Sequence, residues 1–315
     1  MPEELLLSKG NIMTDLLISL LNLSSKLLIY IGSASLIGGW FLLLINSGHS
    51  GFRSFIRRSM LAGAIAGLFA VGINFYAQVG SFAESGWEGL SDPDYQMMLW
   101  DSPVGNSVIL RLAGFALALI IIVFFRFARQ PTSTSSPLWK TGNSILFFVS
   151  LVLLSSAFAL TGHTAEQTLL IRLLLWVHVF IALLWMGSLL PLWYACGVME
   201  AKPLKQIMHR FGLAAMGLVA VLAVCGGVII WQLLASPAEL VTTVYGRVLL
   251  LKIGLVVGIL GLAALHKFRL VPQLTGRPEA IKLRRSILVE SLIGLGILVV
   301  TVLLTTVVGP EFMNG

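Results

Sequence analysis

The chain has 315 residues, of which 57% are hydrophobic and 11% are charged, and its mean hydropathy is +0.94. This composition excludes a soluble globular domain and predicts a membrane protein that crosses the bilayer several times. The net charge of +7 does not indicate a nucleic-acid-binding protein, because the Lys and Arg residues fall in short segments between apolar runs rather than on one face.

Eight apolar segments approach the length of about 20 residues that a helix needs to cross a bilayer. Each is predicted to be a helix, because a segment without internal backbone hydrogen bonds could not cross lipid. The predicted spans are residues 26–45, 60–79, 105–125, 138–160, 161–192, 211–234, 244–265 and 287–308. The fold class is therefore all-α, a polytopic membrane helix bundle. We expect one membrane domain with an N-terminal four-helix half, residues 1–160, and a C-terminal half, residues 161–315.

The charges between the spans predict the orientation of the bundle. Lys and Arg residues cluster after the first, third, fifth and seventh spans, whereas the other loops carry acids such as Asp92 and Glu239. Short loops rich in Lys and Arg stay on the cytoplasmic side. Both termini are therefore expected outside.

Two methionines stand in the loop after the second span. Met97 and Met98 lie beside Trp100 and several acids, and thioether sulfur is a ligand for soft cations. The pair is a candidate for collecting copper at the outer surface. The alternative is that both side chains cap the bundle.

Several ionisable residues fall inside the predicted spans. Three arginines near outer span ends, Arg111, Arg172 and Arg247, are predicted to reach the lipid headgroups. Lys252 lies five residues deeper than Arg247 and needs a carboxylate, carbonyl groups or water as a partner. Glu290 enters the eighth span from the inner side, so a water-filled cavity is an alternative partner for both Lys252 and Glu290.

His178 lies well inside the fifth apolar run, where an ionisable residue is a functional candidate by default. At helical spacing Trp185 and Met186 share its face. Imidazole and thioether groups are both copper ligands. The alternative is that His178 forms a hydrogen bond to a neighbouring helix while Trp185 and Met186 only pack.

Three further histidines lie nearer the membrane boundaries. His163 stands in a short polar break fifteen residues before His178, and we predict that both face one cavity between the fourth and fifth spans. His209 and His266 belong to adjacent inner ends of the sixth and seventh spans, where they are candidates for an inner site of metal release. The alternative is that they are interfacial side chains.

Glycines spaced four residues apart occur in the second and seventh spans. Gly63 with Gly67, and Gly254 with Gly258, have the spacing that lets two helices approach closely. We predict that both pairs lie at helix contacts.

These segments resemble the copper resistance protein D (CopD) family. The runs HRFGLAAMGLVAVLAVCGG from residue 209, TVYGRVLLLK from residue 243 and KLRRSILVESLIG from residue 282 are similar to its R-F-S/G, T-x-Y-G-R-x-L-L-x-K and R-x-x-x-x-E motifs. GHTA at residue 162 and HVFIALLWMGSLLPLW from residue 178 resemble its G-H-A and H-x-x-A-x-x-x-W-x-G-x-L segments. The resemblance extends from about residue 162 to the end and is looser before it.

The resemblance implies a bacterial inner-membrane protein with periplasmic termini that moves copper from the periplasm to the cytoplasm and is not an enzyme. Its histidines correspond to His163 and His178, and the residues at its other motif positions include Trp185, Arg247, Lys252 and Glu290. One departure is His266, which stands where the family often has Asn.

The expected partners are the lipid bilayer and a separate periplasmic copper-binding donor protein, because no such domain is recognisable at either end of the sequence. No nucleotide-binding loop is present, so we expect no nucleotide to drive transport.

The alternative function is that of a membrane electron carrier in which axial histidines hold haem b. It requires two imidazoles at one depth on facing helices, whereas only His178 sits well inside a span. A scaffold subunit without a ligand is a third interpretation.

Overall fold

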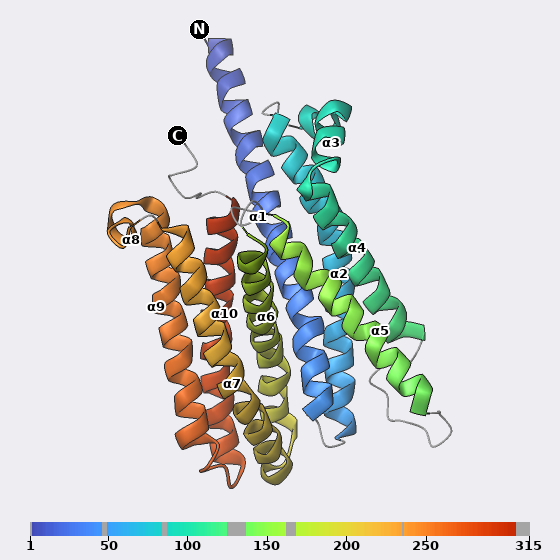
Figure 1. Ribbon diagram of the computed structural model, residues 1–315, viewed down its shortest axis with the longest axis vertical. Coiled ribbons are helices and arrows are strands. Elements are labelled where there is room, and N and C mark those ends of the chain that lie inside the picture. The colour runs from blue at the N-terminus through green and yellow to red at the C-terminus, as the bar shows by residue number, and fades with distance from the viewer. Residues whose placement is uncertain are drawn as a thin grey trace.

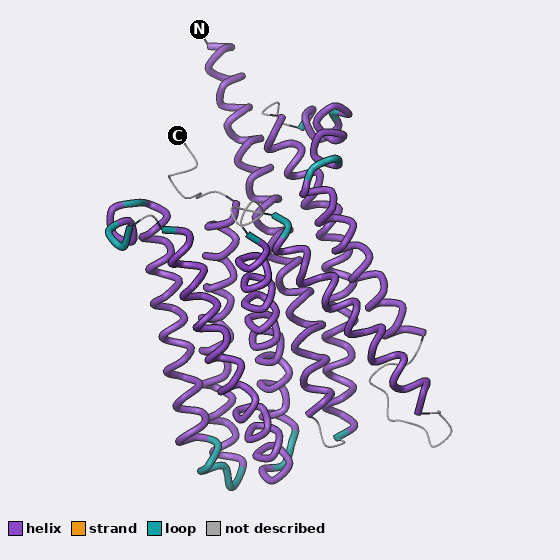
Figure 2. The backbone as a smooth tube through the Cα atoms, in the orientation of Figure 1, coloured by secondary structure: helices purple, strands orange, loops and turns teal. Residues whose placement is uncertain are grey.

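The computed structural model describes residues 2–45, 49–83, 87–124, 137–161, 168–234 and 236–306. Over these ranges all regular structure is helical and no strand is present. Eight of the helices they contain are long and apolar enough to cross a membrane. The predicted all-α polytopic bundle is therefore confirmed (Figures 1 and 2).

The membrane-crossing helices run nearly side by side along the long axis of the molecule (Figure 1). They are α1 Pro2–Ile45, α2 Ser50–Ala83, α4 Pro103–Phe124, α5 Pro137–Ser156, α6 Leu169–Val198, α7 Ala201–Leu233, α9 Val244–Leu265 and α10 Arg277–Thr306. Shorter elements connect them: η1 Glu88–Ser91, α3 Pro93–Trp100, η2 Ala157–Ala159, α8 Glu239–Thr242 and the π-helical turn η3 His266–Leu270.

Several helices extend well beyond the predicted spans. Helix α1 begins at Pro2 rather than near Lys26, and α7 and α10 each begin about ten residues before the predicted boundary. Hydropathy marks only the part of a helix that contacts lipid, whereas the backbone continues until a capping or breaking residue ends it. Pro278, at the second position of α10, is one such residue, because proline is tolerated in the first turn and not further inside.

The helices form two groups that meet at α1 and α6. Helices α1, α2, α4 and α5 pack against one another, and α6 packs against α7 and α10, with α9 on α10. Helix α1 joins the groups by lying along α6 (Figure 1). The division of the chain at residue 160 into two halves stays a prediction.

The contact between α1 and α6 brings two backbones together. A Cβ atom added at Gly187 of α6 would overlap the carbonyl oxygen of Ala34, and one added at Gly38 of α1 would overlap the backbone of Gly187. Only glycine allows such an approach, which is how membrane helices gain packing contacts without a hydrophobic driving force.

The prediction for the spaced glycines is half right. A Cβ at Gly63 would come within 2.7 Å of Ser35 Cβ, and one at Gly67 would overlap the ring of Phe115, so this pair does form a helix contact. Around Gly254 and Gly258, in contrast, no atom of the described residues lies within 4 Å of an added Cβ. The predicted close packing is wrong for this pair.

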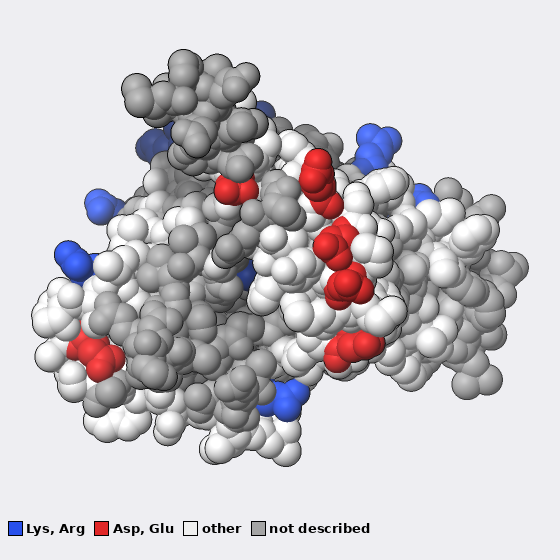
Figure 3. All heavy atoms as spheres, turned by 90° about the horizontal axis from the view of Figure 1, so that it is seen from above, with Lys and Arg blue, Asp and Glu red and all other residues white. Residues whose placement is uncertain are grey.

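Acidic side chains mark one end of the bundle. Helix α1 begins and α10 ends at the end that carries α3 and α8 (Figure 1). Acidic side chains gather on this end, seen face on in Figure 3, and α3 with its neighbouring loops supplies Glu88, Asp92, Asp94 and Asp101. Which side of the membrane this end faces stays a prediction.

Candidate functional site

A cavity of about 460 Å³ lies among α6, α7, α9 and α10, with one wall from α1. His178, Met186 and Lys252 line it, and most of the remaining lining is apolar. We call it the His178 cavity. The structure thus brings together, from two different helices, three residues that the sequence analysis identified as candidates.

The imidazole of His178 is held between α6 and α7. Its Nδ1 lies 3.1 Å from the carbonyl oxygen of Leu222, and because a carbonyl only accepts, Nδ1 donates the hydrogen bond. In the neutral ring Nε2 then carries the lone pair that can bind a metal. Gly226 leaves room for the ring, since a Cβ there would lie 3.0 Å from His178 Cε1. The hydrogen bond to a neighbouring helix that the alternative interpretation expected is present. It is also compatible with a ligand role, because metal-binding histidines usually donate their other ring nitrogen to such an acceptor.

Met186 and Lys252 set the chemistry of the same cavity. Eight residues separate Met186 from His178, a rise of about 12 Å along α6, so the two side chains cannot bind one ion through bonds of about 2 Å. The Met186 sulfur packs on Gly294 of α10, where a Cβ would lie 2.5 Å from it. No described residue accepts a hydrogen bond from the Lys252 ammonium, which leaves a positive charge in the wall of the cavity.

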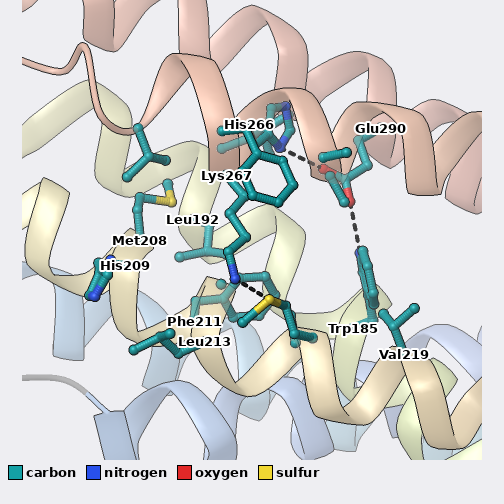
Figure 4. A pocket seen from close by; sticks show the side chains of 18 of the residues that line it. Trp185, Leu192, Met208, His209, Phe211, Leu213, Val219, His266, Lys267 and Glu290 are labelled. Carbon is teal, nitrogen blue, oxygen red and sulfur yellow. Dashed lines mark hydrogen bonds and ion pairs between the residues drawn. The ribbon is translucent and has the colours of Figure 1, made fainter.

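A second cavity, of about 350 Å³, lies nearer the end of the bundle where α9 passes into η3. We call it the Glu290 cavity. Its lining includes Met208, His209 and Met216 of α7 together with His266 and Glu290. Figure 4 shows His209 on the opposite side of this cavity from Glu290 and His266.

Glu290 is buried, with 2% of its surface exposed, and both of its carboxylate oxygens have partners. Oε1 accepts a hydrogen bond of 2.7 Å from the indole N–H of Trp185, and Oε2 lies 3.2 Å from Nδ1 of His266 (Figure 4). The other ring nitrogen of His266 lies 2.7 Å from Ser286 Oγ. Both nitrogens of His266 are thus engaged, so a metal could bind this ring only after one of these contacts breaks. Glu290 does not pair with Lys252, which lines the other cavity.

Trp185 lies between the two cavities. It lines both of them, as do Val219 and Leu260, and its side chain is 5% exposed. The indole is therefore part of a shared wall, and its hydrogen bond to Glu290 fixes it there.

Three of the predicted residues lie elsewhere or outside the described part of the chain. Met97 and Met98 lie on α3 with 68% and 48% of their surfaces exposed and line neither cavity, so the structure does not bring them to His178. His163 lies outside the described residues, and its shared site with His178 stays a prediction.

The arginines predicted to reach the headgroups differ from one another. Arg247 is exposed at the start of α9, where its Nε donates to the carbonyl oxygen of Thr243 at 3.3 Å. Arg111 is only 3% exposed, so for this residue the prediction is wrong. Phe158 of η2 covers the guanidinium, whose Cζ lies 5.2 Å from the centre of the ring.

The sequence interpretation missed two thioether side chains that line the Glu290 cavity. Met208 directly precedes His209, and Met216 follows Met208 by eight residues, two helical turns, so both belong to one face of α7. The sequence pair Met208-His209 could have indicated this cluster, because a thioether stands directly beside an imidazole. In the described part of the chain no three His, Cys, Asp or Glu side chains come together to hold a metal.

Eight apolar helices with ionisable and sulfur-bearing side chains in their internal cavities define a multi-pass membrane protein. The chain belongs to the copper resistance protein D family: residues 205–304 match Copper resistance protein D, and residues 13–170 match the Copper resistance protein D-like N-terminal domain. The resemblance noted in the sequence is therefore confirmed.

A curated relative has a name that also refers to copper. The chain is 27% identical over 261 residues to the copper transport protein CutJ of Bacillus subtilis (strain 168), an alignment that covers 80% of this chain and 46% of the relative. The chain thus spans about half the length of that protein. No solved structure matches it.

Proposed function

We propose that this protein carries copper ions across the bacterial inner membrane from the periplasm to the cytoplasm, through the His178 cavity and then the Glu290 cavity. The observation that carries the proposal is the shared wall. Two cavities that each hold copper-ligating side chains adjoin at Trp185. An ion that crossed this wall would pass from one set of ligands to the other without entering lipid.

The ligands form a sequence along α6 and α7. His178 Nε2 is the first, and the Met186 thioether, two turns along the same helix, is the second. Beyond Trp185 come the sulfur of Met216 and the exposed imidazole of His209. Imidazole nitrogen and thioether sulfur both suit Cu(I), and single weak ligands bind an ion without trapping it.

His266 has a positioning role in this proposal. Its ring is occupied by Glu290 and Ser286, so it orients the carboxylate rather than binding copper in the resting state. Glu290 supplies the negative charge that attracts a cation past Trp185. His209, whose side chain is exposed, would then release the ion to the cytoplasm.

The family and the curated relative support copper as the transported ion, since both are named for copper. A separate copper-binding protein in the periplasm would supply the ion, and the cytoplasm would receive it. The haem alternative has less support, because among the described residues no second histidine lines the His178 cavity.

Copper accumulation in cells that express the protein, compared with cells carrying an empty vector, tests the proposal. We expect His178→Ala and His178→Leu each to reduce copper accumulation to the level of cells carrying the empty vector, while the protein remains in the membrane at the normal level. His49→Ala is the matched control, because His49 is exposed and lines neither cavity. A fully active His178→Leu would make His178 a packing residue, and a Soret band in the purified protein would favour the haem alternative.

A further inference from the structure

Two basic side chains meet near the end of the bundle that carries α3 and α8. Lys26 comes from the middle of α1 and Arg111 from the first half of α4. Arg111 is 3% exposed, and the Phe158 ring covers its guanidinium. Tyr30 stacks on the same ring and lies one helical turn after Lys26 on α1, which places Lys26 near this aromatic contact. Neither residue lines the cavities of the proposed copper path.

Neutral groups surround this pair. The Lys26 ammonium donates to the carbonyl oxygen of Thr305 at 3.0 Å and to Thr306 Oγ1 at 2.9 Å. The guanidinium of Arg111 lies against the ring of Phe158, on which Tyr30 also stacks with 4.4 Å between ring centres.

The charge of the pair is unbalanced. Arg111 Nε is buried and has no hydrogen-bond partner in the part of the chain that the structure describes. No carboxylate of the described residues forms an ion pair with Lys26 or Arg111. Two like charges brought together out of water repel each other and each loses hydration, so a negative partner would stabilise the arrangement.

We infer that Arg111 and Lys26 bind a phosphate-type oxyanion, supplied either by a phospholipid headgroup or by free phosphate. The planar guanidinium matches two oxyanion oxygens through its forked N–H groups, and a lysine ammonium adds a point charge. The position of the pair suits a headgroup that reaches into the bundle, because Lys26 lies level with Thr305 and Thr306 at the last turn of α10, whereas Arg111 itself does not extend to the surface. Bound there, the anion would also lower the positive potential at the adjoining end of the His178 cavity, which Tyr30 and Thr305 line.

Thermal unfolding of the full chain in a neutral detergent tests this site without any copper measurement. Inorganic phosphate and phosphatidylglycerol are added in separate arms, with sodium chloride of equal ionic strength and phosphatidylcholine as their controls. With the anion tenfold above its Kd we expect the unfolding midpoint to rise by about 3 °C. Arg111→Gln should abolish the rise. Arg247→Gln is the matched control and should keep it, since Arg247 is an exposed arginine at the same end of the bundle.

The two arms separate the two sources. A rise with phosphatidylglycerol alone identifies a lipid headgroup, and a rise with both identifies a site open to free phosphate. Arg111→Lys keeps the positive charge but loses the paired N–H donors of the guanidinium. We expect this variant to bind the oxyanion about tenfold more weakly, the effect of losing one charge-assisted hydrogen bond.

If Arg111→Gln fails to fold, Lys26→Gln with native mass spectrometry of retained phosphatidylglycerol gives the second test, and its retained lipid should fall. The inference is overturned if neither anion shifts the midpoint. It is equally overturned if the shift or the retained lipid is the same in the variants as in the unmodified protein.

Discussion

The indole N–H of Trp185 and the carboxylate of Glu290 form a buried hydrogen bond of 2.7 Å at the wall between two cavities. The bond joins α6 to α10, and both residues are at most 5% exposed. A hydrogen bond to a charged acceptor in a region of low dielectric is strong, and leaving either partner unpaired is costly. The same contact therefore stabilises the packing of two helices and keeps the wall closed.

Replacing Trp185 by Ala should open this wall. The change removes the indole from both cavities at once, so copper or protons would pass without the normal barrier. We expect a leak in proteoliposomes that is about tenfold faster, which corresponds to a barrier lowered by about 1.4 kcal/mol. Collapse of an imposed pH gradient, followed with an enclosed dye, measures it.

Trp176→Ala is the control for the loss of a large aromatic side chain. Trp176 lies on the same helix and its indole also donates a hydrogen bond, partly buried, to Ser155 Oγ at 2.7 Å, but it lines neither cavity. We expect it to lower stability without a leak. Equal leaks from Trp176→Ala and Trp185→Ala would show that general loosening of the bundle, and not the wall, explains the effect.

Two substitutions of Glu290 should distinguish the contribution of its hydrogen bonds to stability from the contribution of its negative charge to transport. Glu290→Ala leaves the N–H groups of Trp185 and His266 without their acceptor, so we expect the free energy of unfolding to fall by about 2–5 kcal/mol. Glu290→Gln retains an acceptor for Trp185 but removes the charge, and it should fold while copper accumulation falls about tenfold. Glu279→Gln, on the same helix, should change neither property. Normal accumulation by Glu290→Gln would exclude the carboxylate charge from the transport path.

The sequence predicted the parts of this structure that depend on hydrophobicity. Lipid contact requires long apolar runs, and each of the eight predicted spans overlaps a helix that is long and apolar enough to cross a membrane, although the fifth, residues 161–192, was predicted to begin eight residues before α6 does. The grouping of His178, Met186 and Lys252 was predictable in the same way, because depth within a span can be counted from its boundary. The helix ends were predicted less well, since α1 and α7 begin well before the apolar runs from which their spans were predicted.

What the sequence could not predict depends on which helices are neighbours. Arg111 resembled an arginine that reaches the headgroups, and only the packing of η2 against α4 places Phe158 over it. Gly254 and Gly258 have the same spacing as a true contact pair, yet no helix packs against their face among the described residues. The partners of Glu290, Trp185 and His266, lie 105 and 24 positions away along the chain, so no local sequence pattern could predict these contacts.

Gly187→Ala should disrupt the junction of the two helix groups. Its added methyl group would overlap the Ala34 carbonyl oxygen, which is backbone and cannot rotate away. We expect α1 and α6 to separate and the free energy of unfolding to fall by at least about 3 kcal/mol, the upper range for overpacking.

Gly258→Ala gives the matched control, because an added Cβ meets no described atom there. Alanine favours a helix over glycine by about 1 kcal/mol, so this variant should be as stable as the unmodified protein or slightly more stable. Thermal unfolding in detergent compares the two. Equal midpoints for Gly187→Ala and Gly258→Ala would contradict the close approach of α1 to α6.

Lys252→Met should strengthen the binding of copper in the His178 cavity. The ammonium of Lys252 lines this cavity without an acceptor among the described residues, so it repels a cation held by His178 or Met186. Two unit charges about 10 Å apart at an effective dielectric constant of about 20 repel by about 1.7 kcal/mol, which predicts copper binding on the order of tenfold tighter when the charge is removed. Methionine preserves much of the volume of the side chain and its apolar stem. Competition with a Cu(I) chelator on the purified protein measures the change.

The charge-conserving variant Lys252→Arg separates repulsion from packing. Arginine keeps the positive charge, so we expect its copper affinity to stay close to that of the unmodified protein, whereas its volume and hydrogen-bonding geometry differ from those of lysine. Tighter binding should also slow release, because an ion held more firmly leaves its ligand more slowly, and transport by Lys252→Met should then fall even though binding improves. Equal affinities for Lys252→Met and the unmodified protein would mean that the ammonium is neutralised in the membrane or that copper does not bind in this cavity. Copper binding that is retained by Lys252→Met and lost in Lys252→Met combined with His178→Ala would assign the ion to the cavity that both residues line.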